Sequence, residues 1–405
     1  MLAEFSIGRH TKKEPIGAYE QLRPKWKKWG ILSVVTSFII LAYYFQVGGW
    51  VIYYVYSYLF KSAEVYANPL YYFYNLLGYD AAGGTTFFPW AGAIIFPLIF
   101  AGITVIIILM GVEKGIERFC KVGMPALLIL LFVLLIRSVT LPGAGEGLAY
   151  MLTPDWSKVN GNTVLAALGQ AFFSLSLGMA IMVTYGSYVK KEESLAKNTA
   201  LICGLDTLIA VLAGFMIIPA IFATGVAPGM GGGFAFASLA GVFQNMPAGS
   251  FFGVLFYLLL FFAAITSAIS LLEPSVAALV ERKNWNRKTA TVSMAAIMFV
   301  IGVFYTISQA AVDIKGIWLD LNGVSFPIMG DFMEYLTDRL LLPINALVAC
   351  LLAGWAWGTK NAVEEIRSGG KFAFKAADVW SFSVKFIAPA VIIIIIIFGL
   401  FLGAM

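Results

Sequence analysis

Residues 168–189 form an apolar stretch long enough to cross a membrane, yet small and polar residues interrupt its middle. Gln170, Ser174, Ser176 and Gly178 stand where a simple anchor would carry leucine, isoleucine and valine. A freed backbone group in hydrocarbon is costly, so a break at mid-depth usually lines a cavity or a binding site. Close helix packing through small residues is the alternative explanation. The pattern predicts a broken membrane helix of the kind found in transporter cores.

Two further polar positions lie deep in apolar stretches. Asp206 stands inside residues 199–225, where a charge is expensive and usually marks an ion or proton pathway. A carboxylate at headgroup level is the plainer alternative. Tyr43 and Tyr44 fall near the middle of residues 28–60, where a phenol needs a polar partner. An aromatic belt at the membrane surface would also explain the tyrosines.

A third unusual run, residues 261–274, crowds small and hydroxyl-bearing residues together before Glu273 and Pro274. Thr266 and Ser267 lie in its centre. Hydroxyl and carbonyl oxygens are hard donors of the kind that cations such as Ca²⁺ and Mg²⁺ take in proteins. Helix packing alone explains the alanines and serines, but it gives no reason for a carboxylate beside a proline that kinks the helix.

The composition indicates a membrane protein, because 60% of the 405 residues are hydrophobic, only 12% are charged and the mean hydropathy is +0.86. Apolar stretches of the ~20 residues needed to cross a bilayer occur nine times. They are residues 28–60, 89–110, 123–141, 164–188, 199–225, 251–280, 289–309, 328–357 and 379–403. We therefore predict an all-α polytopic membrane protein with nine visible transmembrane helices.

Lysine and arginine gather in alternate connections between these stretches, which hold 21 of the 27. Since basic residues favour the cytoplasmic side, the chain is predicted to start in the cytoplasm and to end outside it. The same bias explains the net charge of +5, so we expect no nucleic-acid partner. Lys25, Lys27 and Lys28 are expected to lie against lipid headgroups of the bilayer.

The sequence lacks the motifs of metal or covalent catalysis. It has a single histidine, His10, and neither an HExxH nor a CxxC pattern, so we do not expect an enzyme. Cys120, Cys203 and Cys350 fall in a predicted cytoplasmic connection or in spans, and the outer connections hold no N-glycosylation signal. This favours a bacterial or archaeal inner membrane.

Taken together, these stretches resemble the neurotransmitter:sodium symporter family, which has the leucine-transporter fold with its inverted repeat. The resemblance runs from Met1 to about residue 400. It is carried by EFSIGRH at 4–10, EKGIERFCKVGMP at 113–125, LTPDW at 152–156, GQAFFSLSLG at 169–178 and FFAAITSAISLLEP at 261–274.

The resemblance places Met1 at the cytoplasmic end of the family's second helix. We therefore expect a single transporter domain, residues 1–405, that is truncated at its start and shows the third to eleventh helices of an eleven-helix protein. Residues 1–225 would hold the rest of the first repeat with the sixth and seventh helices. Residues 226–405 would hold an outer Gly-rich connection and the eighth to eleventh helices. A misplaced start or an incomplete sequence is the favoured explanation, and a real truncation is the alternative.

In this family an amino acid binds halfway across the membrane, and LGQAFFSLSLG matches the broken sixth helix. By the resemblance, Tyr44 would hold the substrate carboxylate and Ser176 would mark the unwound turn, while Phe173 would cover the substrate from outside. The implied substrate-binding residues are Ile40, Tyr44, Phe173, Ser176, Met179, Ser267 and Leu271. Several are apolar, so the resemblance implies a small hydrophobic amino acid.

The resemblance also implies two sodium sites. Ser174 and Asp206 would serve the first, and Ala263 through its carbonyl with the hydroxyls of Thr266 and Ser267 would serve the second. Many relatives have asparagine where this chain has Asp206. The carboxylate would supply the charge that chloride provides in other members, and the position four residues later is an uncharged alanine, so we expect chloride-independent transport.

Gate positions match as well. Phe173 and Glu334 would close the outside, and Glu281, near Ser187 and Tyr188, would close the inside. The family's arginine partners would lie in the amino-terminal segment before Met1. We therefore expect both carboxylates to lack a partner in this chain.

The resulting interpretation is sodium-coupled import of an amino acid by alternating access. Two alternatives stay open. One is a truncated membrane protein that does not transport and has an assembly or regulatory role. The other is an amino acid transporter that is coupled to protons through Asp206. The oligomeric state is not predicted.

Overall fold

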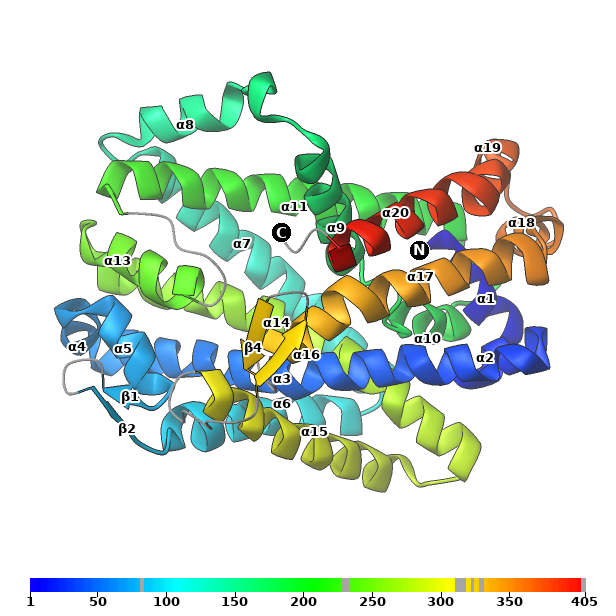
Figure 1. Ribbon diagram of the computed structural model, residues 1–405, viewed down its shortest axis with the longest axis horizontal. Coiled ribbons are helices and arrows are strands. Elements are labelled where there is room, and N and C mark those ends of the chain that lie inside the picture. The colour runs from blue at the N-terminus through cyan, green and yellow to red at the C-terminus, as the bar shows by residue number, and fades with distance from the viewer. Residues whose placement is uncertain (81–83, 227–232, 310–317, 322–323, 328–330, 402–405) are drawn as a thin grey trace.

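The computed structural model describes residues 1–80, 84–226, 233–309, 318–321, 324–327 and 331–401. It is a bundle of helices, most of which run along the long axis of the molecule (Figure 1). Apolar segments of this length form helices because only internal hydrogen bonds satisfy the backbone in hydrocarbon. The expected all-α polytopic architecture is confirmed.

Eight helical segments of the described residues are long and apolar enough to cross a membrane. They are Pro24–Phe60, Trp90–Leu109, Lys114–Val139, Leu195–Thr224, Gly249–Lys283, Arg287–Ser308, Phe332–Ala356 and Ala377–Ile397. Their main α-helical parts are α3 (Lys27–Phe60), α6 (Phe96–Leu109), α7 (Arg118–Val139), α11 (Leu195–Thr224), α14 (Gly249–Lys283), α15 (Arg287–Gln309), α17 (Leu342–Leu351) and α20 (Ala388–Phe401). Wider π-helical turns extend several of them, at Trp90–Ile95, Val112–Glu117, Leu336–Leu341, Leu352–Ala356 and Ser383–Ile387.

The ninth predicted span, residues 164–188, is not one long helix. It consists of α9 (Gly161–Ser174) and α10 (Ile181–Tyr188), which are separated by six residues without helical structure. The broken helix expected from Ser174, Ser176 and Gly178 is therefore confirmed.

Short elements connect the spans. The helices are α1 (Leu2–Thr11), α2 (Pro15–Leu22), α4 (Ser62–Ala67), α5 (Pro69–Leu76), α8 (Ala144–Leu152), α13 (Leu239–Gln244), α16 (Asp331–Tyr335), α18 (Thr359–Ile366) and α19 (Ala377–Phe382). Single helical turns lie at Pro24–Trp26, Trp156–Lys158 and Phe234–Ser238. Two small antiparallel hairpins pair β1 (Tyr79–Asp80) with β2 (Thr85–Thr86) and β3 (Trp318–Leu321) with β4 (Val324–Pro327). Residues 227–232 of the predicted Gly-rich connection lie outside the described residues.

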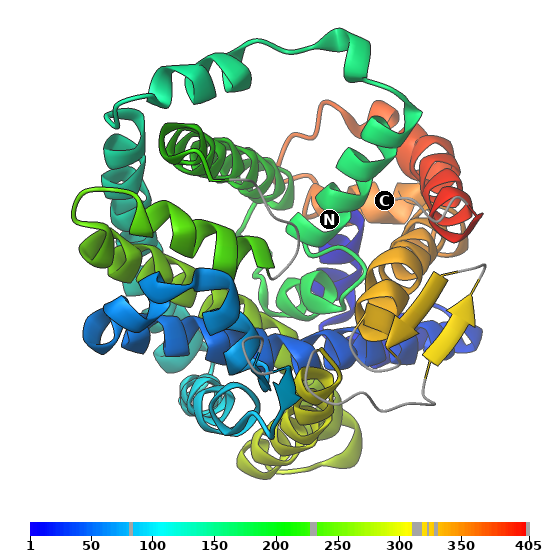
Figure 2. The ribbon, with the colours of Figure 1, turned by 60° about the vertical axis from the view of Figure 1, so that its left-hand side comes forward.

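The two ends of the bundle hold different connections. α1, α2 and α18 lie at one end, and α4, α5 and α13 lie at the other (Figure 1). The first group carries the basic segments 9–29 and 358–378. In the view of Figure 2, α8 and α9 arch over α11 on one side of the bundle.

The largest apolar core forms where α3 packs along α14, α15 and α6. A smaller cluster joins α1 and α2 to α10 and α17 at the basic end. Residues of α10 belong to both cores, Ile181 to the larger and Val183 to the smaller, so the cores hold the helix that follows the break.

Candidate functional site

The break begins with a regular helix ending. The Leu177 amide donates to the Phe172 carbonyl at 3.0 Å and the Ser176 amide to the Phe173 carbonyl at 3.0 Å, which is the Schellman pattern. This ending needs a left-handed residue, and Ser176 supplies it with a φ of 52°. Gly178 and Ala180 also have positive φ values, of 75° and 63°. The chain therefore turns sharply between the carboxyl end of α9 and the amino end of α10.

Side chains distant in the sequence satisfy the backbone of the break. The Gly178 amide donates to Glu4 Oε1 at 3.0 Å, and its carbonyl accepts from Asn345 Nδ2 at 3.0 Å. Gly178 is also pressed against α17, because a Cβ there would lie 2.4 Å from the Leu342 carbonyl oxygen. Glu4 and Asn345 are both buried, so they give the Gly178 amide and carbonyl the hydrogen-bond partners that lipid could not provide. The sequence analysis missed both residues.

Ser174 and Asp206 lie together as predicted for the first ion site. Ser174 Oγ donates to both carboxylate oxygens of Asp206, at 2.7 and 2.8 Å. Ser174 is the last residue of α9, where the helix end carries partial negative charge. Hydroxyl, carboxylate and helix end thus bring oxygen atoms and negative charge together at the end of α9.

The second predicted oxygen cluster lies on α14. The hydroxyls of Thr266 and Ser267 both donate to the Ala263 carbonyl, at 2.9 and 3.2 Å. Ser267 is exposed although it lies in the middle of a membrane-length helix, and its side chain lies close to the Tyr44 hydroxyl on α3. Tyr44 therefore lies beside the oxygen cluster on α14.

The apolar residues predicted for the substrate pocket share one core. Ile40, Met179 and Leu271 are each nearly inaccessible and belong to the same apolar cluster. Phe173 differs, because it remains 39% exposed at the end of α9. Packing therefore holds Ile40, Met179 and Leu271 in place, but it does not hold Phe173 in the same way.

A cavity of about 410 Å³ lies beside the break, but the predicted substrate residues do not line it. Its wall comes from residues 1–4, α9, α17 and the 380–392 region, and is mainly apolar. Glu4 faces it, and its Oε2 is buried without a hydrogen-bond partner among the described residues. The cavity therefore reaches the break at Leu177, but none of the predicted substrate residues lines it. We assign it no substrate.

The expectation that both gate carboxylates lack a partner is wrong. Glu334 Oε1 accepts from the Tyr305 hydroxyl at 2.6 Å, and Glu281 Oε2 accepts from the Glu14 amide at 2.9 Å. A hydroxyl on α15 and the backbone amide just before α2 satisfy the two carboxylates.

Tyr188 does not pair with Glu281 but with Glu273, whose Oε1 accepts from the tyrosine hydroxyl at 2.8 Å. Arg287 donates two hydrogen bonds to the same carboxylate, at 3.1 and 2.7 Å. Ser187 Oγ turns back to the Thr184 carbonyl. Glu273 is fully buried and forms an ion pair with Arg287 that joins α14 to α15 near α10. This ion pair explains why a carboxylate stands beside Pro274 inside a membrane-length helix.

Replacing Arg287 with glutamine should lower the free energy of unfolding by about 3–5 kcal/mol, because it leaves a buried carboxylate without its cation. The measurement is unfolding in detergent by denaturant titration. The matched control is Lys121→Gln in the pair between Lys121 and Glu117, whose side chains are 71% and 53% exposed, and it should cost at most about 1 kcal/mol. Equal losses in the two variants would contradict the account.

The sequence and structure both match known transporters. The model of the sodium:neurotransmitter symporter family matches residues 61–403. A sodium-dependent transporter of Haemophilus influenzae is 34% identical over 99% of this chain and 87% of its own length. One from Bacillus subtilis is 31% identical over 98% and 85%. The crystal structure of MhsT in complex with L-phenylalanine has a TM-score of 0.84 and 34% identity, and the match covers 98% of this chain and 87% of MhsT.

These matches cover the break, both oxygen clusters and the gate carboxylates, and they agree with a polytopic sodium-dependent transporter that is not an enzyme. The chain belongs to the sodium:neurotransmitter symporter family.

Proposed function

We propose that this protein imports a small hydrophobic amino acid together with sodium. The observation that carries the proposal is the direct contact of Ser174 with Asp206 at the broken end of α9. A carboxylate inside a membrane-length helix is costly unless a cation or hydrogen bonds compensate it. Sodium would replace the Ser174 bond, because both partners are oxygen ligands.

The amino acid would bind at the break between α9 and α10. The positive end of α10 and the Tyr44 hydroxyl suit its carboxylate, while the negative end of α9 suits its amine. Ile40, Met179 and Leu271 offer an apolar surface, and Phe173 would close over the substrate from outside. The match to MhsT bound to L-phenylalanine supports an amino acid as cargo.

The second sodium would use the Ala263 carbonyl with Thr266 and Ser267. Since Ser267 lies close to the Tyr44 hydroxyl, this ion would be coupled to the substrate through these two side chains. Ser176 would present the unwound backbone to the substrate. The two ions together would make substrate binding depend on sodium.

Alternating access would connect the site to the two sides in turn. Glu334 and Phe173 belong to the outer closure, and Glu281 with the 187–188 segment belongs to the inner one. The basic end of the bundle, with α1, α2 and α18, would face the cytoplasm, and the chain would end outside the cell membrane. In this arrangement residues 1–225 would hold the rest of the first repeat with the sixth and seventh helices. Residues 226–405 would hold the outer Gly-rich connection and the eighth to eleventh helices.

Chloride should not be required. Asp206 brings a fixed negative charge to the first sodium site, and the nearby Ala210 offers no ligand to an anion. Replacing chloride with gluconate should leave sodium-driven uptake unchanged within error. Uptake that disappears in gluconate would sink this part of the proposal.

The test of the function is uptake of radiolabelled L-phenylalanine, L-leucine and L-alanine by cells that make the protein from its own locus, compared with cells in which the gene is deleted. Uptake by the gene-bearing cells should follow an inward sodium gradient at fixed pH. A response to a proton gradient without sodium would favour the proton-coupled alternative, and no difference between the cells would favour a protein that does not transport.

A further inference from the structure

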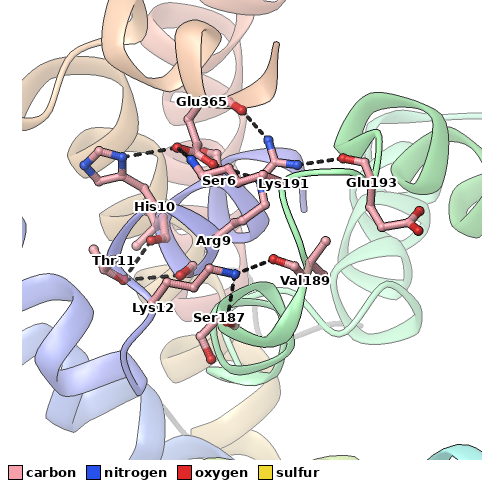
Figure 3. Close-up of polar contacts among 12 residues, drawn as sticks. Ser6, Arg9, His10, Thr11, Lys12, Ser187, Val189, Lys191, Glu193 and Glu365 are labelled. Carbon is pink, nitrogen blue, oxygen red and sulfur yellow. Dashed lines mark hydrogen bonds and ion pairs between the residues drawn. The ribbon is translucent and has the colours of Figure 1, made fainter. Parts of the chain in front are cut away.

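The basic end of the bundle contains a dense polar cluster that the proposed transport site does not use. It joins α1, the 187–193 segment that contains the end of α10 and the residues after it, and α18 (Figure 3). Arg9 is fully buried and Glu365 is almost so, with side chains 0% and 3% exposed. A buried ion pair at the rim of a membrane protein holds its segments in one arrangement, because either charge is costly to leave alone.

Glu365 on α18 is the centre of this cluster. Its Oε1 accepts from Arg9 Nε at 2.8 Å, and its Oε2 contacts His10 Nδ1 at 3.2 Å and Lys191 Nζ. Its backbone carbonyl accepts a second bond from Arg9. Burial raises the pKa of Glu365, but Lys191, Arg9 and His10 outweigh it and leave the pKa below its ordinary value, so the carboxylate stays charged at neutral pH.

Arg9 binds the third segment as well. Its Nη1 donates to the Glu193 carbonyl at 2.7 Å, so one guanidinium bridges α18 and the 187–193 segment. The planar, forked guanidinium suits this role, because it donates in several directions at once.

α1 and α10 form one packed unit on the other side of the cluster. A Cβ at Gly8 would lie 2.0 Å from the Val183 carbonyl oxygen, and one at Gly186 would lie 2.7 Å from the Phe5 carbonyl oxygen. Lys12 Nζ also donates to the Ser187 and Val189 carbonyls at the end of α10. The cytoplasmic half of the broken helix therefore cannot move away from α18 without α1.

We propose that Arg9 and Glu365 are a second inner gate, a latch that holds α1 and α10 against α18 while the inside is closed. The inference rests on the proposed alternating access, in which α10 must move for the substrate to leave. Its motion would separate Lys191 and Arg9 from Glu365. The latch is distinct from Glu281, which belongs to α14 and accepts a hydrogen bond from the Glu14 amide.

Neither residue touches the substrate site, so Arg9 and Glu365 are positioning residues that act through α10. Their loss should shift the balance between inner-closed and inner-open states without removing an ion ligand. A merely structural ion pair would change stability instead and leave this balance unchanged.

The experiment measures the distance between spin labels on the full chain, purified from the native host and placed in lipid nanodiscs. Cys120, Cys203 and Cys350 are replaced by alanine, and labels are attached through Glu192→Cys and Lys360→Cys, both at exposed positions. The two labels sit on the two sides of the latch. Double electron–electron resonance then compares sodium with potassium.

The unmutated latch should give mainly the short distance in sodium and a larger long-distance population in potassium. In sodium, Arg9→Gln and Glu365→Gln should each raise the ratio of long to short distances by about tenfold. The Arg9→Lys variant should instead retain mostly the short distance. The matched control is Glu117→Gln, which removes one carboxylate from an exposed pair and should change nothing.

The outcomes separate the two proposals. If sodium shifts the distances but Arg9→Gln and Glu365→Gln behave like the control, the latch is wrong and alternating access stands. If sodium has no effect on the unmutated latch, alternating access and the latch both fall. Thermal unfolding of each variant is measured in parallel, and a variant that loses stability while its distances stay unchanged also overturns the latch.

Discussion

Asp206→Ala should raise the sodium concentration for half-maximal substrate binding by about 100-fold, because it removes both the charge and the oxygens that face Ser174. Asp206→Asn keeps one oxygen and should raise it by about 10-fold. The measurement is binding of radiolabelled amino acid to purified protein over a series of sodium concentrations at constant ionic strength.

The matched control is Asp155→Asn, since Asp155 is an exposed carboxylate that pairs with Lys158 in the connection between α8 and α9. It should leave the sodium dependence unchanged. A variant of Asp206 that binds substrate with the unchanged sodium requirement would remove this residue from the ion site.

Gly178→Ala should prevent the break from forming in its present shape. The residue has a φ of 75°, and the new Cβ would lie 2.4 Å from the backbone oxygen of Leu342. The left-handed conformation costs roughly 1–2 kcal/mol for alanine, and forcing extra volume into a packed site typically costs about 1–3 kcal/mol more. We expect a protein of lower thermal stability in detergent that no longer binds substrate.

Gly169→Ala provides the control for this substitution. Gly169 lies inside α9, and a Cβ there would meet no heavy atom within 4 Å. Alanine should be neutral or slightly stabilising at a helical position of this kind. If the two glycine variants behave alike, the conformation of the break does not determine stability or binding.

The spans and the break could be predicted because each depends on local sequence. Apolar length sets a membrane helix, and Ser174, Ser176 and Gly178 interrupt one in a way that lipid does not tolerate. The partners of the break could not be predicted in the same way. Glu4 and Asn345 are more than 160 residues from Gly178, and only the packing of α1 and α17 brings them to it.

The pairs of Glu273 and Glu281 show why contacts between distant segments cannot be predicted from a local pattern. Glu273 was recognised as unusual beside Pro274, but nothing in its own helix indicates Tyr188 or Arg287. Glu281 was expected to lack a partner, whereas a backbone amide, which no side-chain pattern reveals, satisfies it. The residues proposed for the substrate and sodium sites remain predictions that binding measurements must decide.

The most direct test of the central claim is the binding of radiolabelled L-phenylalanine to the purified protein in sodium and in potassium at the same ionic strength and pH. The account predicts saturable binding in sodium that is lost in potassium and that unlabelled hydrophobic amino acids displace. Saturable binding of equal strength in the two salts would contradict a sodium-coupled amino acid site at the break.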